Sequence, residues 1–344
     1  PTQHSVKELQ SFGIKPDILV ARADGHIEEK MREKIALFCN VRKENVIENI
    51  TANSLYEVPL LLEKQGLAEA VCKKLGLEKE CNNENWIELN KKISECTETV
   101  KIALVGKYMK LEDSYISVVE SLRHGGYANK VNVEIGFIDS ENVTEENAKE
   151  ILKDYDGILV PGGFGNRGIE GKIAAIKYAR ENKVPFLGIC LGMQMAVVEF
   201  ARNVLGIKDA DSAEFDEETK NPVIHIMEEQ KSVTKKGGTM RLGAYPCVIK
   251  ENTLAHKVYN TKEISERHRH RYEYNNEYKK ILEENGLICS GASPDGKLVE
   301  IVELKDHPYF IAGQFHPEFQ SRPDRPGPLF VGLIKNAKEF KNKK

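Results

Sequence analysis

A cysteine between two glycines is the residue in this sequence best suited to act as a nucleophile. An apolar run ends at Cys190 within Gly188-Ile-Cys190-Leu-Gly192, and an amphipathic pattern starts directly after it, which predicts a strand, a sharp turn and a helix. This is the form of a nucleophile elbow with cysteine in place of serine, in which glycines remove side chains that would collide. The helix N-terminus favours the reactive thiolate. We therefore predict a nucleophile, although an isolated cysteine would be taken as a buried structural residue.

The stretch Gln314-Phe-His316-Pro-Glu318 contains the residue types that assist a thiolate. In an extended segment residues two apart point the same way, so we expect His316 and Glu318 to share a face. Pro317 disfavours helical backbone at His316 and helps to hold that shape. Alone, this stretch is typical of a loop with a surface acid. Together with Cys190 it predicts a catalytic Cys-His-Glu triad.

A third stretch, Leu159-Val-Pro-Gly-Gly-Phe-Gly165, is an apolar strand that runs into glycines. The N–H of Gly163 can join the N–H of Leu191 in binding an oxyanion. Glycine-rich turns are common, so this prediction is specific only because Cys190 and His316 occur in the same sequence.

The elements that must position these groups alternate between strand and helix patterns. For residues 99–344 this predicts an α/β fold with a doubly wound parallel sheet, in which Gly163 and Cys190 follow strand C-termini, where ligands bind in such sheets. From about residue 223 onward the strands are expected to be short and turn-rich. The expected strands are 100–106, 131–138, 157–160 and 185–189, and the expected helices are 115–124, 145–155, 169–181, 191–204 and 329–340.

Residues 1–80 show the same alternation over a shorter length, with expected helices 5–12, 28–38 and 55–75 and strands 17–22 and 45–50. No Gly-x-x-x-x-Gly-Lys-[Ser/Thr] phosphate loop occurs in the chain, so we expect this part to be the end of a larger α/β domain. The polar stretch 81–98 is expected to be a linker with one short helix, pinned to a domain surface by Trp86.

Composition excludes several classes of function. The 344 residues carry a formal net charge of -3, which does not suggest affinity for nucleic acid. The sequence shows neither a long apolar run nor a signal-like start, so we expect no membrane span and a cytoplasmic location. The 7 cysteines form no Cys-x-x-Cys pair and are expected to be reduced thiols, with no metal site in the chain.

The three motifs, in this order and spacing, resemble those of the class I (triad) glutamine amidotransferases. Nearly the whole chain is also similar to the CTP synthase family, through three further stretches: Pro1-Thr-Gln-His-Ser-Val-Lys-Glu-Leu9, Gly237-Gly-Thr-Met-Arg-Leu-Gly-Ala244 and Glu266-Arg-His-Arg-His-Arg-Tyr-Glu273. The resemblance implies a glutamine amidotransferase domain preceded by the C-terminal βα portion of a P-loop-like α/β amidoligase domain.

The resemblance implies that ammonia from glutamine aminates UTP to CTP with ATP and Mg²⁺, whose sites lie mostly upstream of this chain. It also implies allosteric activation by GTP, feedback inhibition by CTP, and a homotetramer built through the amidoligase domains. By themselves, we expect these 344 residues to hydrolyse glutamine slowly and to make no CTP, because only isolated nucleotide contacts are present.

Family positions that bind glutamine match three polar residues around the expected nucleophile. Gln194 follows Cys190 by one helical turn and can line the same pocket. Glu214 is expected to take the α-ammonium group, although the family pattern has Thr where Ala213 stands. Arg271 is expected to clamp the α-carboxylate, a task that suits the guanidinium fork. The oxyanion donors complete this set of glutamine contacts.

Nucleotide contacts are implied by the resemblance alone, since each of these residues would otherwise be a solvated surface group. Gln3 and Lys34 match positions that contact UTP or CTP. Arg22 and Ala52 fall near the adenine contacts of ATP. Arg241 lies in the glycine-rich stretch that matches a lid associated with GTP, and it is the expected charged contact there.

Other functions stay open on the sequence. Another triad amidotransferase or a γ-glutamyl hydrolase would share the triad, and nucleotide-dependent glutamine turnover separates them from a CTP synthase. A redox-sensing elbow protein is a non-enzymatic alternative. Alternation is expected to put Arg267, Arg269 and Arg271 on one face and the histidines on the other. A nucleic-acid tract there or a metal site at His268-Arg-His270 is not supported by an aromatic platform or further ligands.

Overall fold

The computed structural model describes residues 1–78, 81–107, 112–227 and 240–344. The chain divides into two compact units, Pro1–Ser94 and Glu95–Lys344. Within the described ranges, no helix combines the length and the apolar character needed to cross a membrane.

The first unit is built on two parallel strands, β1 (Leu19–Ala23) and β2 (Val46–Ile50). Its small core is formed by buried residues of the strands and of the first two helices: Val6, Ile35, Ala36, Cys39 and Val46. The helices are α1 (Thr2–Ser11), α2 (Glu29–Cys39), α3 (Val58–Glu63) and α4 (Leu67–Leu75), with 3₁₀ turns at Lys43–Asn45 and Leu55–Glu57.

The prediction of one helix over 55–75 is wrong, because the segment breaks at Gly66. The backbone of Gly66 has φ 78°, a left-handed conformation that a right-handed helix cannot contain. Its N–H bonds to the Glu63 carbonyl at 2.8 Å, which closes α3, and α4 starts at the next residue.

The stretch predicted as a linker contains helix α5 (Glu84–Ser94), which packs on the first unit. The rings of Trp86 and Tyr56 stack with centroids 6.4 Å apart, and Asn90 donates to the Tyr56 carbonyl at 2.7 Å. The expected role of Trp86 as the residue that pins this helix is supported by the ring contact.

The second unit contains one large mixed sheet. In chain order its strands are β3 (Glu98–Gly106), β4 (Val131–Asp139), β5 (Gly157–Val160), β6 (Phe186–Ile189), β9 (Arg241–Ile249), β10 (Glu263–His270), β12 (Leu287–Ala292), β13 (Val299–Leu304) and β14 (Phe310–Gly313). Across the described residues these 9 strands are ordered β10-β9-β12-β13-β14-β6-β5-β3-β4. Strands from β14 to β4 are parallel, as predicted. Strands from β10 to β14 pair antiparallel, which extends the predicted parallel sheet.

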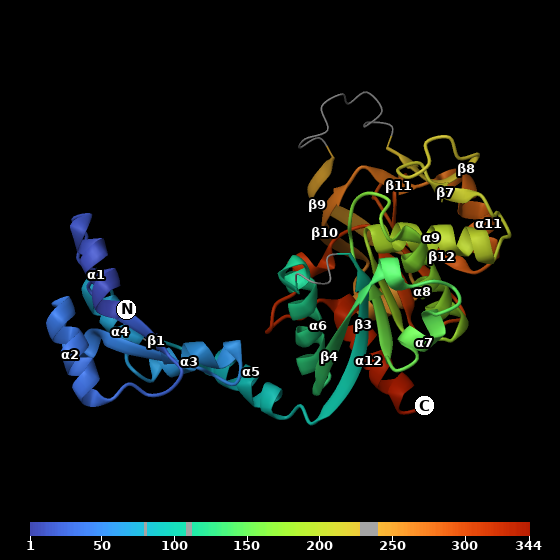
Figure 1. Ribbon diagram of the computed structural model, residues 1–344. Coiled ribbons are helices and arrows are strands. Elements are labelled where there is room, and N and C mark those ends of the chain that lie inside the picture. The colour runs from blue at the N-terminus through green and yellow to red at the C-terminus, as the bar shows by residue number, and fades with distance from the viewer. Residues whose placement is uncertain (79–80, 108–111, 228–239) are drawn as a thin grey trace. The chain divides into compact units, whose positions relative to one another are not determined.

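Helices cover both faces of this sheet (Figure 1). Ile102 and Leu104 of β3 pack in one core with α6 (Ile116–Ala128), α10 (Leu254–Tyr259) and α12 (Pro328–Lys341). Their neighbours Ala103 and Val105 point to the opposite core. That core contains α7 (Ala148–Leu152), α8 (Ile169–Glu181), α9 (Leu191–Asn203) and α11 (Lys279–Glu284).

One helix of this unit differs clearly in length from its prediction. The helix expected over 145–155 is shorter, since only Ala148–Leu152 is α-helical. A small second sheet is made of β7 (Ala210–Ser212), β8 (Asn221–Ile226) and β11 (Tyr272–Tyr274), and 3₁₀ turns lie at Glu112–Tyr115, Ser140–Asn142, Asn276–Tyr278 and Pro317–Phe319.

Candidate active site

The predicted nucleophile, its expected partner and the glycine turn all follow neighbouring parallel strands. Strands β14, β6 and β5 are adjacent in the sheet and run the same way. Because the C-terminal ends of parallel strands lie at one edge, the residues that follow them come together there. Gly162 follows β5, Cys190 follows β6 and His316 follows β14.

Cys190 stands in a strained turn between β6 and α9. Its backbone has φ 52° and ψ -103°, an unfavourable region for a residue with a side chain. The turn is held by a hydrogen bond from the Cys190 N–H to the Gly313 carbonyl at 2.7 Å. A Cβ at Gly192 would lie only 2.1 Å from the Val160 carbonyl oxygen, so the close approach of α9 to β5 requires glycine. The predicted strand, turn and helix are confirmed at this position.

His316 and Glu318 form a close pair at the end of β14. The imidazole Nδ1 lies 2.8 Å from a Glu318 carboxylate oxygen, and both side chains are largely buried. The predicted extended backbone is wrong beyond His316, because Pro317–Phe319 is a 3₁₀ turn. This turn, rather than strand alternation, returns the carboxylate to the ring.

The electrostatics of His316 favour its charged form. Burial alone would lower the pKa of the imidazole, but the Cys190 sulfur and the Glu318 carboxylate outweigh it and raise the pKa to about 10. The ring is therefore protonated at neutral pH. It also lies close under the glycine turn, since a Cβ at Gly162 would be 2.8 Å from His316 Cε1.

The glycine turn after β5 is held on two sides. The Lys107 amine donates to the Phe164 carbonyl at 2.8 Å and also to the Gly165 carbonyl. The Gly165 N–H donates to a Glu214 carboxylate oxygen at 3.3 Å. Gly163 lies close to Leu191, whose Cδ2 would be 3.4 Å from a Cβ at Gly163. The two expected oxyanion residues are thus neighbours.

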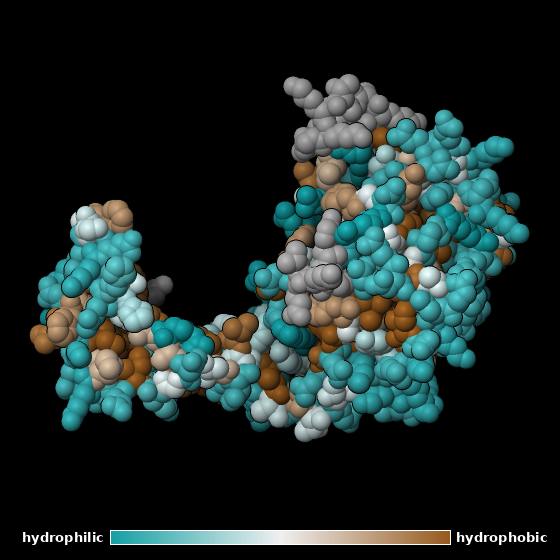
Figure 2. Space-filling view, in the orientation of Figure 1, coloured by the Kyte–Doolittle hydropathy of each residue, from teal (hydrophilic) through white to brown (hydrophobic). Residues whose placement is uncertain are grey.

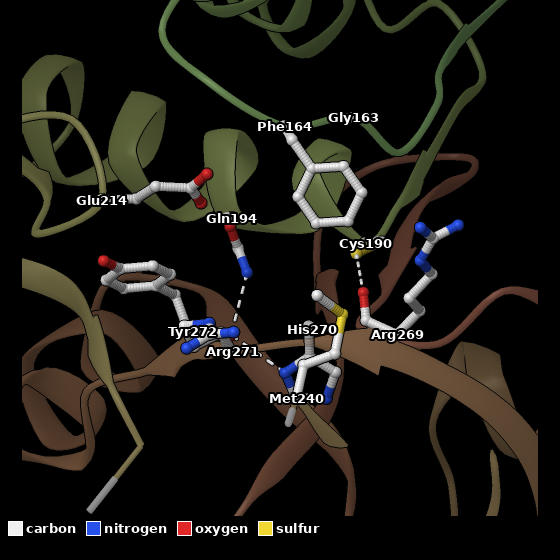
Figure 3. Close-up of a pocket in the computed structure, with 10 residues that line it drawn as sticks. All are labelled: Gly163, Phe164, Cys190, Gln194, Glu214, Met240, Arg269, His270, Arg271 and Tyr272. Carbon is white, nitrogen blue, oxygen red and sulfur yellow. Dashed lines mark hydrogen bonds between the residues drawn. The ribbon is translucent and has the colours of Figure 1, made fainter. Parts of the chain in front are cut away.

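An open pocket is lined by the Cys190 side chain (Figure 3). All three residues expected to bind glutamine, Gln194, Glu214 and Arg271, line it. The complete lining is Gly163, Phe164, Cys190, Gln194, Glu214, Met240, Arg269, His270, Arg271 and Tyr272.

Polar contacts orient the groups in this pocket. The Gln194 amide donates to the Tyr272 carbonyl at 3.0 Å and to Gln314 Oε1 at 3.2 Å. The Gln314 amide in turn donates to the Cys190 sulfur at 3.6 Å. Burial raises the pKa of Glu214, against the lowering effects of the Gly165 N–H and of nearby cations. The pocket therefore offers a thiol, an amide, a carboxylate and a guanidinium to one small ligand.

Several residues of this region were not predicted as functional from the sequence. Lys107, Gln314 and His270 contact the glycine turn, the thiol or the pocket. Lys172 on α8 is fully buried, and a Cβ at Gly163 would lie 3.6 Å from its amine. A signal for Lys172 was available, because it lies three residues after Ile169 and therefore on the apolar stripe of the helix.

The predicted alternation is confirmed along β10, whereas Arg271 lies beyond the end of this strand. Arg267 and Arg269 are exposed, whereas His268 and His270 are buried. His268 Nε2 lies 2.7 Å from Glu300, and His270 Nδ1 lies 3.0 Å from the Tyr272 carbonyl. His268 thus lies in a buried setting with Glu300 as a partner, whereas His270 Nε2 is buried without a hydrogen-bond partner among the described residues.

Arg241, the expected contact for GTP, has its guanidinium inside the unit. The side chain is 8% exposed and forms an ion pair of 2.7 Å with the fully buried Glu300. It also lies 4.4 Å from the centre of the Tyr245 ring. In this structure the guanidinium is committed to Glu300 and is not presented to solvent. Residues 237–239 of the same stretch lie outside the described residues.

The residues expected to contact nucleotides lie in the first unit. Gln3 is on α1, and Lys34 is exposed on α2. Arg22, near the end of β1, donates to Thr51 at 2.9 Å, so Arg22 and the segment that includes Ala52 lie together at the ends of β1 and β2.

Comparison with known proteins relates both units to one group. Residues 110–336 match the family described as glutamine amidotransferase class-I, and residues 1–77 match the family described as CTP synthase N-terminus. CTP synthase of Clostridium beijerinckii is 58% identical over 340 residues, which cover 98% of this chain and 63% of that protein. CTP synthase of Bacillus subtilis is 56% identical over 345 residues, covering 100% of this chain and 64% of that protein.

A solved structure is similar to the second unit. It is described as the glutaminase domain of Trypanosoma brucei CTPS with bound acivicin, and it is 40% identical with a TM-score of 0.66. The match covers 70% of this chain and 94% of that one. The chain thus spans somewhat less than two thirds of the length of the curated relatives cited above and nearly all of a glutaminase domain.

Proposed function

The chain belongs to the class-I glutamine amidotransferase family, and from that premise we propose that it is the glutaminase part of a CTP synthase, joined to the end of the amidoligase part. Its own reaction is the hydrolysis of the glutamine side-chain amide to glutamate and ammonia. One observation carries most of the support for this proposal. Cys190, His316 and Glu318 lie together beside a pocket that is lined by an acidic and a basic side chain.

The α-amino-acid end of glutamine is held by two complementary charges. The Glu214 carboxylate takes the α-ammonium group, and the Arg271 guanidinium takes the α-carboxylate. This orientation directs the side-chain amide to Cys190 at the other end of the pocket. Gln194, fixed by Tyr272 and Gln314, borders the path between them.

Acylation begins with attack of the Cys190 sulfur on the amide carbon. A carbon–sulfur bond forms, and the carbonyl π electrons move to the oxygen, which receives hydrogen bonds from the Gly163 and Leu191 N–H groups. His316, protonated at neutral pH, then gives its proton to the amide nitrogen. The carbon–nitrogen bond breaks, ammonia leaves, and a thioester remains on Cys190.

Deacylation reverses these roles with water in place of ammonia. Neutral His316 takes a proton from water, whose oxygen attacks the thioester carbon. The carbon–sulfur bond breaks, glutamate leaves, and the thiolate and imidazolium are restored. Glu318 keeps the ring oriented in both steps through its 2.8 Å contact with Nδ1.

In the whole protein, the released ammonia aminates UTP to CTP in the cytoplasm, with ATP as the phosphate donor. Gln3 and Lys34 contact UTP or the inhibitor CTP, and Arg22 and Ala52 border the adenine of ATP. GTP activates the glutaminase, and the whole proteins associate as tetramers. Among the described residues, no group of three or more His, Cys, Asp or Glu side chains is placed to hold a metal ion.

A glutaminase assay of the purified chain tests this proposal. The wild type should release glutamate from glutamine, and Cys190→Ala should abolish that release. Acivicin should protect Cys190 from alkylation by iodoacetamide, as judged by mass spectrometry, because the similar glutaminase domain binds it. Cys289→Ala is a matched control, since this buried thiol lies outside the pocket around Cys190. Glutamine turnover that survives in Cys190→Ala would refute the assignment.

In a full-length form of the enzyme, Cys190→Ala should keep CTP synthesis from added ammonia, because only the ammonia source is lost. Equal loss of both activities would contradict the division of labour between the two parts. The present chain alone should make no CTP, which chromatography of reactions containing UTP, ATP and Mg²⁺ would check.

A further inference from the structure

A buried lysine without a partner lies behind the active site. Lys172 on α8 is 0% exposed, and its amine has no hydrogen-bond partner among the residues that the structure describes. Burial of an ammonium group without compensation is unfavourable, and lysine is seldom fully buried. A position on the apolar stripe of a helix would be filled more favourably by an aliphatic residue. Its presence therefore calls for an explanation beyond packing.

The amine of Lys172 lies under the glycine turn. A Cβ at Gly163 would be 3.6 Å from the nitrogen, so the amine approaches the backbone whose N–H is the proposed oxyanion donor. Lys107 also approaches this turn, but its amine is committed to the Phe164 and Gly165 carbonyls. Lys107 therefore supports the turn through hydrogen bonds, whereas the Lys172 amine places a charge near the turn without forming a hydrogen bond to a described residue.

Three titratable groups face this amine from neighbouring elements: Lys107 after β3, Cys190 before α9, and Glu214 after β7. Burial lowers the pKa of Lys172 to about 7, repulsion by Lys107 lowers it further, and Cys190 and Glu214 act in the opposite direction. The charge of Lys172 is thus coupled to the charge of Cys190, and it is lost as pH rises through the neutral range.

We propose that Lys172 is a positioning residue for the proposed glutaminase reaction, whose ammonium group stabilises the Cys190 thiolate and the oxyanion through the Gly163 turn. The oxyanion part of this inference rests on the proposed function, and the thiolate part does not. Because the Lys172 amine is fully buried, its positive charge acts on a neighbouring negative charge with little screening by water. The ammonium touches neither reacting atom directly.

This role predicts a characteristic pH dependence. Below about pH 7 the amine is charged and favours the thiolate, and above about pH 8.5 it is neutral and has no such effect. His316 keeps its proton over this range, because its pKa is about 10. Loss of the Lys172 charge should therefore slow the reactions of Cys190 at low pH and leave them unchanged at high pH.

The test compares Lys172→Met with Lys177→Met in the full chain. Methionine keeps most of the length of the side chain without its charge. Lys177 is a partly exposed lysine of the same helix that pairs with Glu145 at 2.8 Å. The first measurement is the rate of Cys190 alkylation by iodoacetamide between about pH 6 and pH 9, followed for the Cys190 peptide by mass spectrometry. The second is kcat/KM for glutamine over the same range.

In Lys172→Met both rates should fall about 3- to 10-fold near pH 6 and converge with the wild type near pH 9, while Lys177→Met should follow the wild type throughout. If the ratio of the Lys172→Met rate to the wild-type rate is below one and constant across the pH range, the proposal is overturned, and the role of Lys172 is in packing. Equal rates at every pH would overturn it as well. Circular dichroism and thermal melting check the fold, and an apolar side chain at this buried position should not lower the melting temperature.

Failure of this inference can be distinguished from failure of the proposed function. If wild-type protein alkylates at Cys190 with the expected dependence on Lys172 but hydrolyses no glutamine, the proposed function fails and the effect of Lys172 on the thiolate stands. If glutamine is hydrolysed and the two lysine variants behave alike, the inference on Lys172 fails alone.

Discussion

Gly162→Ala should impair catalysis without removing any catalytic group. The new Cβ would lie 2.8 Å from His316 Cε1, about 0.6 Å closer than the 3.4 Å at which ordinary contact begins. His316 is held by the contact of its ring with Glu318 and by the hydrogen bond from its backbone N–H to the Arg267 carbonyl, so the new Cβ requires the ring or the turn to shift. Misplacement by about 1 Å can reduce a rate about 100-fold. We expect kcat to fall about 10- to 100-fold, or about 1.4 to 2.7 kcal/mol in the barrier.

Gly163→Ala is the matched comparison, one residue further along the turn. Its Cβ would meet Leu191 Cδ2 at 3.4 Å and the Lys172 amine at 3.6 Å, both ordinary contacts, so the loss of kcat should be about threefold or less. Steady-state glutaminase kinetics measure both variants, and KM should change little because Gln194 and Glu214 are untouched. Wild-type kcat in a folded Gly162→Ala protein, or equal losses in the two variants, would refute this account of His316 placement.

Three further predictions concern the same site. Glu318→Gln should lower the pKa of His316 from about 10, which should move the basic limb of the kcat/KM profile to lower pH. It should also reduce kcat about 100-fold or more. A basic limb at its wild-type pH would contradict the proposed action of Glu318 on His316. Arg271→Ala should cost roughly 1.5 to 3 kcal/mol of glutamine affinity, seen mainly as raised KM, and an unchanged KM with lowered kcat would place Arg271 outside the substrate site. Gly192→Ala should destabilise the fold by about 3 kcal/mol or more, since its Cβ would lie 2.1 Å from the Val160 carbonyl oxygen; a wild-type melting temperature would contradict this.

The first unit exposes several large apolar side chains and has a small core. Figure 2 shows apolar side chains at several places on the visible face of the molecule. Large apolar side chains of this unit that are more than half exposed include Phe12, Ile14, Leu37, Phe38, Leu55 and Leu75. The first unit also has a much smaller buried core than the second.

Local features of the active site were predictable from the sequence. The elbow at Cys190 depends on steric limits within five residues. A Cβ at Gly188 or at Gly192 would collide with neighbouring atoms, so both positions of the turn require glycine. The helix over 169–181 was predicted with its observed bounds, because apolar spacing and a preceding glycine act over a few residues. Alternation along β10 was likewise predicted, since side chains of a strand point to opposite faces in turn.

Only the tertiary structure decided which distant groups meet. Cys190 and His316 come together because β6 and β14 are neighbours in the sheet, and strand order depends on the packing of the whole unit. The same holds for Arg241, whose ion pair with Glu300 joins two strands far apart in sequence. The position of Lys172 on the apolar stripe of α8 indicates burial, but the fold decides which groups surround its amine. Local sterics act within a turn of chain, whereas pairing and burial are properties of the complete fold.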